Sequence, residues 1–524
     1  MEFLNDLKGA LEDAEWYKIG LGVFLVYCGY RYLRFVRVRA QLSHIPTLGS
    51  SSLFPSYFTA VKYFRNGRAL LTSGVQQFPG GIFKIPTLDG WQVVVHGREK
   101  LNDMKAAKEE ELSVLEAFVD LIKANYTIGP TALRDPYHID AVRTPLTRNI
   151  GARFDDVSDE IAAAFEDNFP KGDGEEWTPL RVTRPIQNVV VRASNRLLVG
   201  LPLCRNTDYC DLNIRFTIDV MTDAILISLF PKFLHPLVGP LISKGKRNMS
   251  QAMGHLERIV RERMEMATEE RPNDYVTWLV DMNAQIGKDW QKGSIEDIVL
   301  RVLSTNFAAI HTTSTAFTHA IYHLAAHPEV QPLLREEIDR VLFGEDGLGW
   351  TKAGMVQLRV MDSFVKETQR FSGVSAVAMT RVAVKPFRFS DGTVIPPGTT
   401  VGFAGHAVHQ DASVYPSPEE FNATRFSDIR TGTDSIKYQT VTPTPEWLIF
   451  GVGKHACPGR FFAVNEIKSM LVYLVRNWDV KFDEGEAGVK WEVGEGGIPK
   501  GEEYAGNAVP NRDVQVLFRR RKAP

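Results

Sequence analysis

The stretch between Ser294 and Pro328 constrains the fold most strongly, because neither proline nor glycine interrupts it. Ser294-Ile295-Glu296-Asp297 fits a helix-capping box, which predicts that a helix begins there and continues until Pro328. About 33 helical residues extend about 50 Å at a rise of about 1.5 Å per residue, which is longer than most helices of globular proteins. A helix of this length needs a large helical body to cover it.

The remaining pattern agrees with a helical body that carries strands at its edges. From Glu99 to about Met355 the apolar spacing is mostly helical. The segment Ile82–Val95, with an Asp-Gly pair between two apolar runs, is typical of a β-hairpin, and so is Phe387–Gly398 with its Ser-Asp-Gly turn. The Gly- and Glu-rich segment Gly485–Pro510 is predicted to be a surface loop. The predicted fold class is therefore mainly α with small β-sheets (α+β).

Inside the long helix the chain reads Ala308-Ala309-Ile310-His311-Thr312-Thr313-Ser314. Small side chains let a flat ligand lie against a helix, and hydroxyl side chains can loosen the backbone hydrogen bonds locally. The same residues also suit a crossing between two helices, with the threonines and the histidine satisfied in the core. Taken alone, this stretch leaves both interpretations open.

A second unusual stretch is Phe450-Gly451-Val452-Gly453-Lys454-His455-Ala456-Cys457-Pro458-Gly459, which directly precedes an apolar helix. Glycines let the backbone approach something flat and bulky. Backbone N–H groups at a helix N-terminus stabilise a nearby thiolate. These features indicate an axial sulfur ligand for a haem iron, although such a loop taken alone is usually a turn with a small buried residue.

A charged pair lies on the predicted helix Val360–Phe371. Glu367 and Arg370 are three residues apart and share one helix face. Such pairs are ordinarily solvated, but the aromatic and aliphatic neighbours of this one indicate burial. Arg425, in the following loop region, supplies a further guanidinium.

Charge and cysteine content narrow the function. The net charge of −2 gives no indication of nucleic-acid binding. Four cysteines in 524 residues are too few for a disulfide framework and indicate a reducing, cytosol-facing environment. Cys204 and Cys210 have neither a second pair nor a histidine at ligand spacing, which argues against a metal site there.

The N-terminus predicts a membrane anchor, because Trp16–Tyr30 is apolar and aromatic apart from Lys18. The segment is short, since about 20 residues are needed to cross the hydrocarbon layer. The acidic residues before it and the lack of a small-residue cleavage site argue against a signal peptide, and the arginines after it favour a cytoplasmic exit. A buried amphipathic helix is the other alternative. The predicted division is an anchor at 1–39, a linker at 40–55 and a catalytic domain at 56–524.

In their order and spacing these motifs resemble those of the cytochrome P450 family of haem-thiolate monooxygenases. The haem-loop pattern of that family, Phe-x-x-Gly-x-Arg-x-Cys-x-Gly, is met at Phe450, Gly453, Cys457 and Gly459. His455 stands where arginine is commoner.

Three further positions carry the resemblance. Glu367 and Arg370 match the family's Glu-x-x-Arg pair, and Arg425 its third partner. Ala308–Thr312 matches the oxygen-activating motif Ala/Gly-Gly-x-Asp/Glu-Thr. The wording of these motifs looks most like that of fungal microsomal members that act on terpenoid or steroid skeletons.

The resemblance implies a cytochrome P450 fold with haem b as the cofactor and Cys457 as its axial thiolate ligand. Phe450 would pack near the sulfur, and His455 and Arg381 would contact the haem propionates. The family's Trp-x-x-x-Arg motif is missing; Arg143, together with His138, would replace it unless both are ordinary surface residues of a helix.

The resemblance also implies that Thr312 hydrogen-bonds dioxygen and helps to deliver protons. His311 stands where the family usually has a carboxylate and is a candidate proton relay. The substrate cavity would be walled by Leu115–Ile128, by the long helix near Phe307 and Thr313, and by Val374–Met379.

No flavin or dinucleotide fingerprint occurs in the sequence, so electrons are expected from NADPH through NADPH–cytochrome P450 reductase, docked near Lys454 and Arg460. The expected function is insertion of one oxygen atom from O2 into a hydrophobic, terpenoid or steroid-like substrate in secondary metabolism, at the endoplasmic reticulum membrane. The alternatives are hydroxylation of fatty acids or aromatics, a haem-thiolate isomerase or dehydratase, and a membrane-anchored haem-binding protein without monooxygenase activity.

Overall fold

The computed structural model describes residues 2–522, apart from residues 89, 130, 173, 287–293, 431–435 and 484–490. For residues 2–17, 19, 20 and 23 it describes only the helical backbone. Asp89 of the predicted hairpin turn and the beginning of the predicted loop from Gly485 therefore lie outside the described residues.

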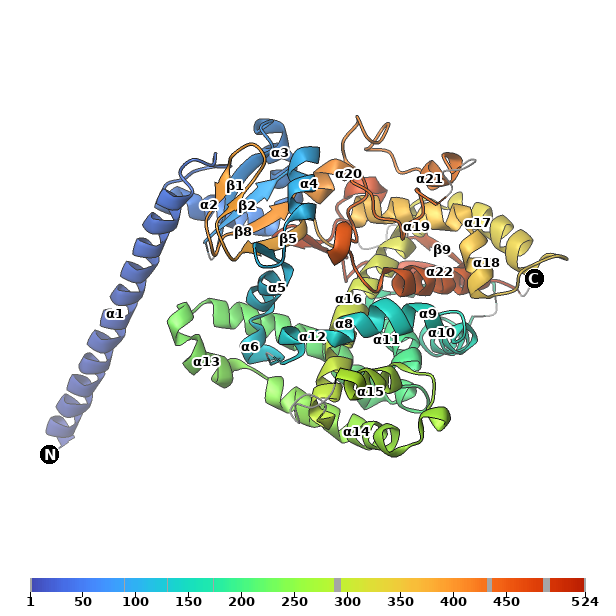
Figure 1. Ribbon diagram of the computed structural model, residues 1–524, viewed down its shortest axis with the longest axis horizontal. Coiled ribbons are helices and arrows are strands. Elements are labelled where there is room, and N and C mark those ends of the chain that lie inside the picture. The colour runs from blue at the N-terminus through green and yellow to red at the C-terminus, as the bar shows by residue number, and fades with distance from the viewer. Residues whose placement is uncertain are drawn as a thin grey trace.

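The body of the molecule is a helical bundle built around α16 (Ile295–Ala326), as Figure 1 shows. This helix confirms the prediction for the long uninterrupted stretch: the Asp297 N–H donates to the Ser294 hydroxyl at 3.2 Å, and the helix ends before Pro328. The helices that pack directly on α16 include α7 (Thr131–Arg134), α11 (Thr183–Leu198), α12 (Thr207–Ser228), α14 (Gly245–Glu265), α15 (Tyr275–Ile286), α19 (Arg359–Ser372) and α22 (Arg460–Asn477).

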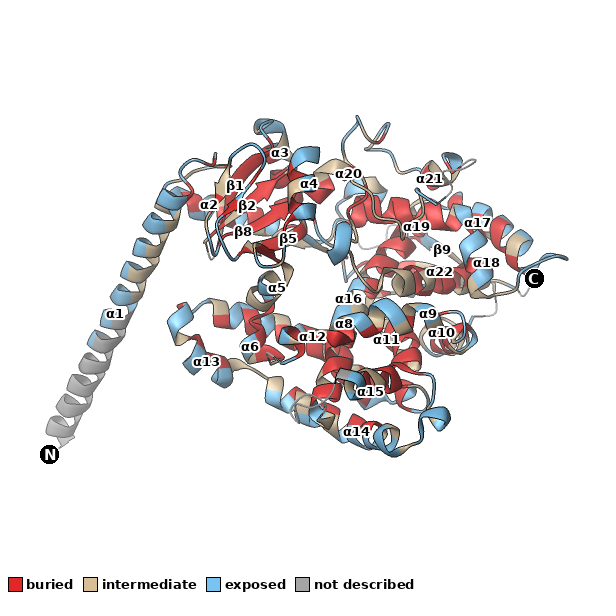
Figure 2. Ribbon diagram, in the orientation of Figure 1, coloured by how far each residue is buried: buried red, intermediate tan, exposed pale blue. Residues whose placement is uncertain are grey.

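The main hydrophobic core runs through this bundle, and Figure 2 shows α19 as an almost wholly buried helix. A further layer, α10 (Phe154–Asn168), covers α11 and α22. The apolar residues of α16 are buried on several sides, so its sequence lacks the single stripe of a surface helix.

A five-stranded sheet lies at one edge of the bundle, in the order β1-β2-β8-β5-β3. β1 and β2 form the predicted hairpin and pair from Ile82 with Val95 to Thr87 with Gly90. β2 pairs in parallel with β8, whereas the other neighbours are antiparallel. The strands are β1 (Ile82–Thr87), β2 (Gly90–Val95), β3 (Leu112–Ser113), β5 (Ala378–Ala383) and β8 (Thr400–Phe403).

The smaller sheets confirm one prediction and correct another. The second predicted hairpin is formed by β6 (Phe387–Arg388) and β7 (Val394–Ile395). The segment predicted to be a loop up to Pro510 contains a hairpin of β10 (Glu502–Tyr504) and β11 (Asn507–Val509). The glycines of this segment predict a loop, but Ala505 and Gly506 form the two-residue turn of the hairpin, where both have positive φ. A third sheet joins β4 (Thr178–Leu180), β12 (Val516–Arg520) and β9 (Trp478–Phe482).

The N-terminal helix α1 (Glu2–Gln41) extends away from the body in Figure 1. The Tyr27 hydroxyl donates to the Leu229 carbonyl at 3.0 Å, and the ring of Tyr30 packs edge-to-face on Phe233 at 5.7 Å. Within the described residues, no single helix combines the length and apolarity needed to cross a membrane; one sharply bent pair, Thr207–Ser228 with Lys232–Ile242, meets both criteria.

Candidate active site

The loop from Phe450 to Gly459 places Cys457 just before the first turn of α22. The Cys457 N–H donates to the Phe450 carbonyl at 2.8 Å, which closes the loop. Gly451 and Gly453 have φ of 65° and 78°, a region that a side chain disfavours. The glycines of the motif therefore fix the turn that presents the sulfur.

The electrostatics of the sulfur have two opposing causes. Burial raises the pKa of the Cys457 thiol, whereas the N–H groups of Gly459 and Arg460 and the charge of Arg460 lower it. Burial is the larger cause, so the predicted N–H donors are present but do not alone make the side chain a thiolate. A metal ion that binds a thiol removes its proton outright.

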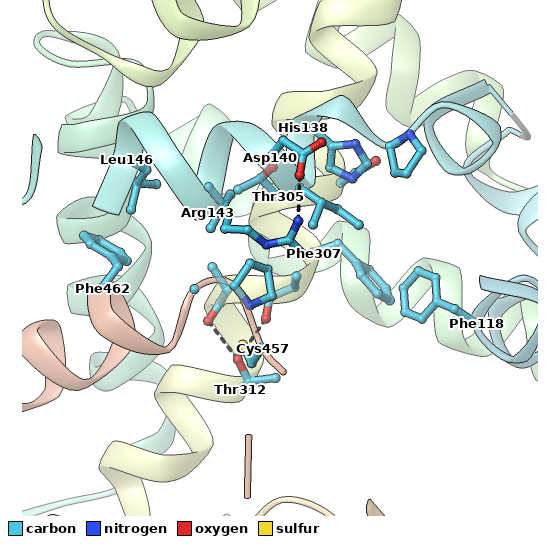
Figure 3. A pocket seen from close by; sticks show the side chains of 18 of the residues that line it. Phe118, His138, Asp140, Arg143, Leu146, Thr305, Phe307, Thr312, Cys457 and Phe462 are labelled. Carbon is cyan, nitrogen blue, oxygen red and sulfur yellow. Dashed lines mark hydrogen bonds and ion pairs between the residues drawn. The ribbon is translucent and has the colours of Figure 1, made fainter. Parts of the chain in front are cut away.

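A cavity of about 590 Å³ lies against this sulfur. Figure 3 shows Phe118, Phe307, Thr312 and Cys457 around it. Of the four cysteines, all of which the structure describes, Cys457 alone lines the cavity; Cys204 and Cys210 are buried elsewhere and Cys28 is exposed. The cavity wall is mostly apolar, as is typical of sites for hydrophobic ligands.

Thr312 lies on α16 and faces this cavity. Its hydroxyl donates back to the Ala308 carbonyl at 2.8 Å and lies 3.3 Å from the Ala309 carbonyl. A hydroxyl in this position keeps its lone pairs for a ligand in the cavity.

His311 is directed elsewhere. Its Nε2 lies 2.8 Å from the Ile214 carbonyl of α12, and the residue does not line the cavity. Burial lowers the pKa of this imidazole. Adjacent residues of a helix point about 100° apart, so a cavity-facing Thr312 turns His311 away. The predicted role of His311 as a proton relay has no support in this position.

Most of the residues predicted to hold the haem propionates lie on the wall of the cavity. His455 and Arg143 line the cavity together with Cys457. Arg381 is buried, and burial lowers its pKa to about 10; its guanidinium donates to the Thr380 carbonyl at 2.9 Å. Arg143 forms an ion pair with Asp140 at 2.7 Å, which Figure 3 marks with a dashed line.

His138, the other substitute for the missing motif, is engaged with protein groups. It is buried, its Nδ1 lies 3.3 Å from the Arg301 guanidinium, and burial lowers its pKa to about 3. His138 also lines the cavity, but a neutral imidazole supplies no positive charge for a carboxylate, whereas the Arg143 guanidinium does, so Arg143 is the better candidate of the two.

These residues fit a haem. The cavity lining combines a sulfur donor with an imidazole and a guanidinium that can bind carboxylates. Arg381 is a buried cation whose described hydrogen bond goes to a neutral carbonyl; the Glu109 carboxylate acts on it through charge alone, so this guanidinium can still donate to a carboxylate of the ligand. Phe450 contributes its carbonyl to the loop; the packing of its ring on the sulfur stays a prediction.

Glu109 is a cavity residue that the sequence did not reveal. Its Oε1 accepts from the Ser113 hydroxyl at 2.6 Å and from the Leu115 N–H at 3.0 Å. Its Oε2 lies 3.4 Å from His455 Nε2. In the sequence it belongs to the charged run Lys108–Glu111, which is typical of a solvated surface, so no local signal distinguishes it.

The Glu367–Arg370–Arg425 group forms as predicted. Arg370 donates twice to Glu367 at 2.9 Å, and Arg425 Nε donates to the same carboxylate at 3.0 Å. Both members of the first pair have side chains that are 0% exposed. The group joins α19 to α21 (Arg425–Asp428), and none of its three members is among the described lining of the cavity.

The cavity wall confirms two of the three predicted segments. Phe118 and Ile128 come from the first segment, and Phe307 and Thr313 come from α16. Val374–Met379 was predicted wrongly, because none of its residues is among the described lining. This segment leads into β5, and its Ala376 and Met379 are buried in the clusters on the two faces of the sheet.

Comparisons with known proteins agree with this geometry. A family model described as Cytochrome P450 matches residues 57–499. Cytochrome P450 monooxygenase 151 of Postia placenta is 36% identical over 488 residues, which cover 92% of this chain and 94% of that one. Cytochrome P450 monooxygenase CYP512U6 of Ganoderma lucidum is 31% identical, over 84% of this chain and 86% of that one.

Solved structures show the same fold at low identity. The cyanobacterial CYP120A1, solved with retinoic acid bound, has a TM-score of 0.65 at 16% identity and is covered over 98% of its length by 91% of this chain. The sulfur-walled cavity, the buried Glu-Arg-Arg group and the family match over most of the chain lead to one conclusion. The chain belongs to the cytochrome P450 family of haem-thiolate monooxygenases.

Proposed function

We propose that this monooxygenase oxidises a terpenoid or steroid-like skeleton in secondary metabolism. The observation that carries the proposal is the cavity, whose surface is mostly apolar, with Phe118 and Phe307 in the same lining as Cys457. A rigid, mostly hydrocarbon substrate would fill such a cavity without burying unpaired polar groups of its own.

The residues of the chain have distinct tasks in this reaction. Haem held by the Cys457 thiolate would supply the activation of dioxygen. The apolar wall binds the substrate and excludes water. The Thr312 hydroxyl presents a hydrogen-bonding group to the cavity, and the cations Arg143 and Arg381 would balance the carboxylates of the cofactor.

Electrons are proposed to come from NADPH through NADPH–cytochrome P450 reductase. Lys454 is exposed on the loop that carries Cys457 and is suited to an acidic partner surface. Arg460, the other predicted docking residue, is occupied: its Nε donates to the Val441 carbonyl at 3.1 Å and its Nη1 to the Cys457 carbonyl at 2.8 Å. Lys454 is therefore the better candidate.

We also propose attachment to the endoplasmic reticulum membrane, with the catalytic body on the cytoplasmic side. Large apolar side chains are exposed on α2 (Leu53–Arg65), where Phe58 is 80% exposed, and on α13 (His235–Ile242), where Leu241 is 80% exposed. α1 contacts α2, where Arg31 donates to the Tyr57 hydroxyl at 3.4 Å, and it also contacts the segment before α13. Fractionation of cells that express the full chain and a 40–524 truncation checks this: the full chain is expected in the microsomes.

Product profiling tests the substrate class. Microsomes that contain this chain and the reductase would be incubated with NADPH and a panel of triterpenes and steroids, with fatty acids and aromatics as the competing classes. Oxidised terpenoid or steroid products, absent from microsomes with the Cys457→Ser variant, are expected. Turnover of fatty acids or aromatics alone would favour the alternative hydroxylase.

A further inference from the structure

His311 connects two helices that together shape the cavity. Its Nε2 is 2.8 Å from the Ile214 carbonyl in the first half of α12, while the next residue, Thr312, faces the cavity. A carbonyl can only accept, so Nε2 carries the proton in this bond. The neighbouring side chains Ile310 and Ile214 belong to one small buried cluster, so the bond lies in a packed contact.

The two halves of α12 are attached to different parts of the molecule. The first half is fixed to the bundle: the Tyr209 hydroxyl donates to the Asn195 side chain at 3.1 Å, and Ile214 accepts from His311. In the second half, Asp219 and Asp223 accept from Lys244, which lies just before α14. Ile214 is therefore the last point at which a described polar contact ties α12 to α16.

The contact between His311 and Ile214 lies next to a group of aromatic side chains, two of which line the cavity. Phe307, one turn before His311, lines the cavity and packs edge-to-face on Phe216 of α12 at 6.3 Å. It also packs edge-to-face on Phe118 of α5 (Val114–Ile122) at 6.1 Å. A shift of α12 along α16 would move Phe216 and so change the space available beside Phe307.

We infer that His311 is a positioning residue: its hydrogen bond to Ile214 holds α12 in place on α16 and thereby sets the shape of the cavity wall beside Phe307 and Phe118. It does not carry protons to Thr312. The inference deepens the proposed function and rests on it, because the wall described is that of the proposed substrate cavity.

The surroundings of His311 do not suit a residue that transfers protons. Its Nε2 proton is committed to a helix carbonyl, and the residue is not part of the cavity lining. Burial is the main cause that lowers its pKa, and the charges of Arg512 and Arg184 add to it. A proton relay needs a group that exchanges protons readily near the working pH.

Three variants of the haem-loaded enzyme separate the two roles. His311→Gln keeps an N–H donor at about the position of Nε2, His311→Asp restores the carboxylate usual in the family but cannot donate, and His311→Ala removes the bond. Each would be measured for 4-phenylimidazole affinity by its difference spectrum and for hydrogen peroxide released per NADPH with reductase present.

For a positioning role, His311→Gln should behave like the unaltered enzyme. His311→Asp and His311→Ala should bind 4-phenylimidazole about fivefold more weakly, the effect of losing one hydrogen bond of ordinary strength. The opposite order, with His311→Asp retaining low peroxide release and His311→Gln releasing more, would identify a relay and overturn the inference.

Hydrogen exchange on the unaltered enzyme tests the inference without relying on a variant that folds. Amides in the first half of α12, residues 208–217, should exchange several-fold more slowly than those in residues 219–228. Uniform exchange along α12 would overturn the inference. None of these three measurements needs the natural substrate, so a failure to find a terpenoid or steroid substrate affects only the proposed function.

Discussion

At the scale of single residues, Cys457 determines the spectrum of the enzyme. The reduced carbon monoxide complex is expected to show the red-shifted Soret band of a thiolate-ligated haem, because Cys457 is the only cysteine on the cavity wall among the four that the structure describes. Cys457→His should move the band to the position of an imidazole-ligated haem. An unchanged spectrum in that variant would show that another group binds the iron.

Thr312 determines how efficiently reducing equivalents reach the product. Thr312→Ala removes the hydroxyl that faces the cavity and is expected to lower product formed per NADPH by about a hundredfold, the lower end of the usual range for a positioned proton-transfer group. Thr318→Ala is the matched control, because Thr318 makes the same back-bond, to Ser314 at 2.7 Å, but does not line the cavity. Equal losses in both variants would attribute the effect to helix stability.

Glu109 adds a fixed negative charge to the cavity wall. Burial opposes its ionisation, but hydrogen bonds from Ser113 and from backbone N–H groups, with the nearby His455, leave its pKa lowered. Glu109→Gln should therefore make the reduction potential of the haem more positive, since removal of a negative charge favours the added electron. Potentiometric titration checks this, with Glu116→Gln on the exposed face of α5 as the control.

Among the structural elements, α19 depends on the buried Glu367–Arg370 pair. Glu367→Gln leaves two guanidinium groups without their carboxylate and is expected to lower the free energy of unfolding by about 3–5 kcal/mol. Denaturant titration of the haem-loaded enzyme measures this. The exposed Glu336→Gln variant should change stability by less than about 0.5 kcal/mol; a small loss in both would mean that the buried group is weakly stabilising.

The sequence predicts a structural element well when the residues that specify it are neighbours in the chain. The start and length of α16 depend on a cap and on the absence of breakers, both visible between Ser294 and Pro328. The Glu367 group and the cysteine loop were found because short motifs encode them. Glu109 and His455 meet across more than 340 positions of sequence, and nothing in either segment reports the other.

The direction of His311 was open to prediction but was missed. A helix with Thr312 on the cavity side places its neighbour about 100° away, so the periodicity already argued against a shared role. The partner, the Ile214 carbonyl, could not be predicted, because every backbone carbonyl is an acceptor and only packing selects one.

For the whole molecule, buried neutral histidines predict loss of stability in acid. Burial lowers the pKa of His319 to about 3, so below about pH 6.5 the unfolded chain binds a proton that the folded chain rejects. The free energy of unfolding should fall by about 1.4 kcal/mol per pH unit for this group as the pH decreases from about 6.5 toward 3. Denaturant titrations at several pH values should show a shallower slope for His319→Gln than for the exposed control His44→Gln.

The parallel pairing of β2 with β8 has a consequence for biosynthesis. β2 ends at Val95 and β8 begins at Thr400, so the partner of β2 leaves the ribosome about 300 residues later. At about 5–20 residues per second, the β1–β2 hairpin waits roughly 15–60 s with one edge unpaired. During translation this edge is a binding site for chaperones and a risk of aggregation, and slower synthesis of the second half of the chain would prolong both.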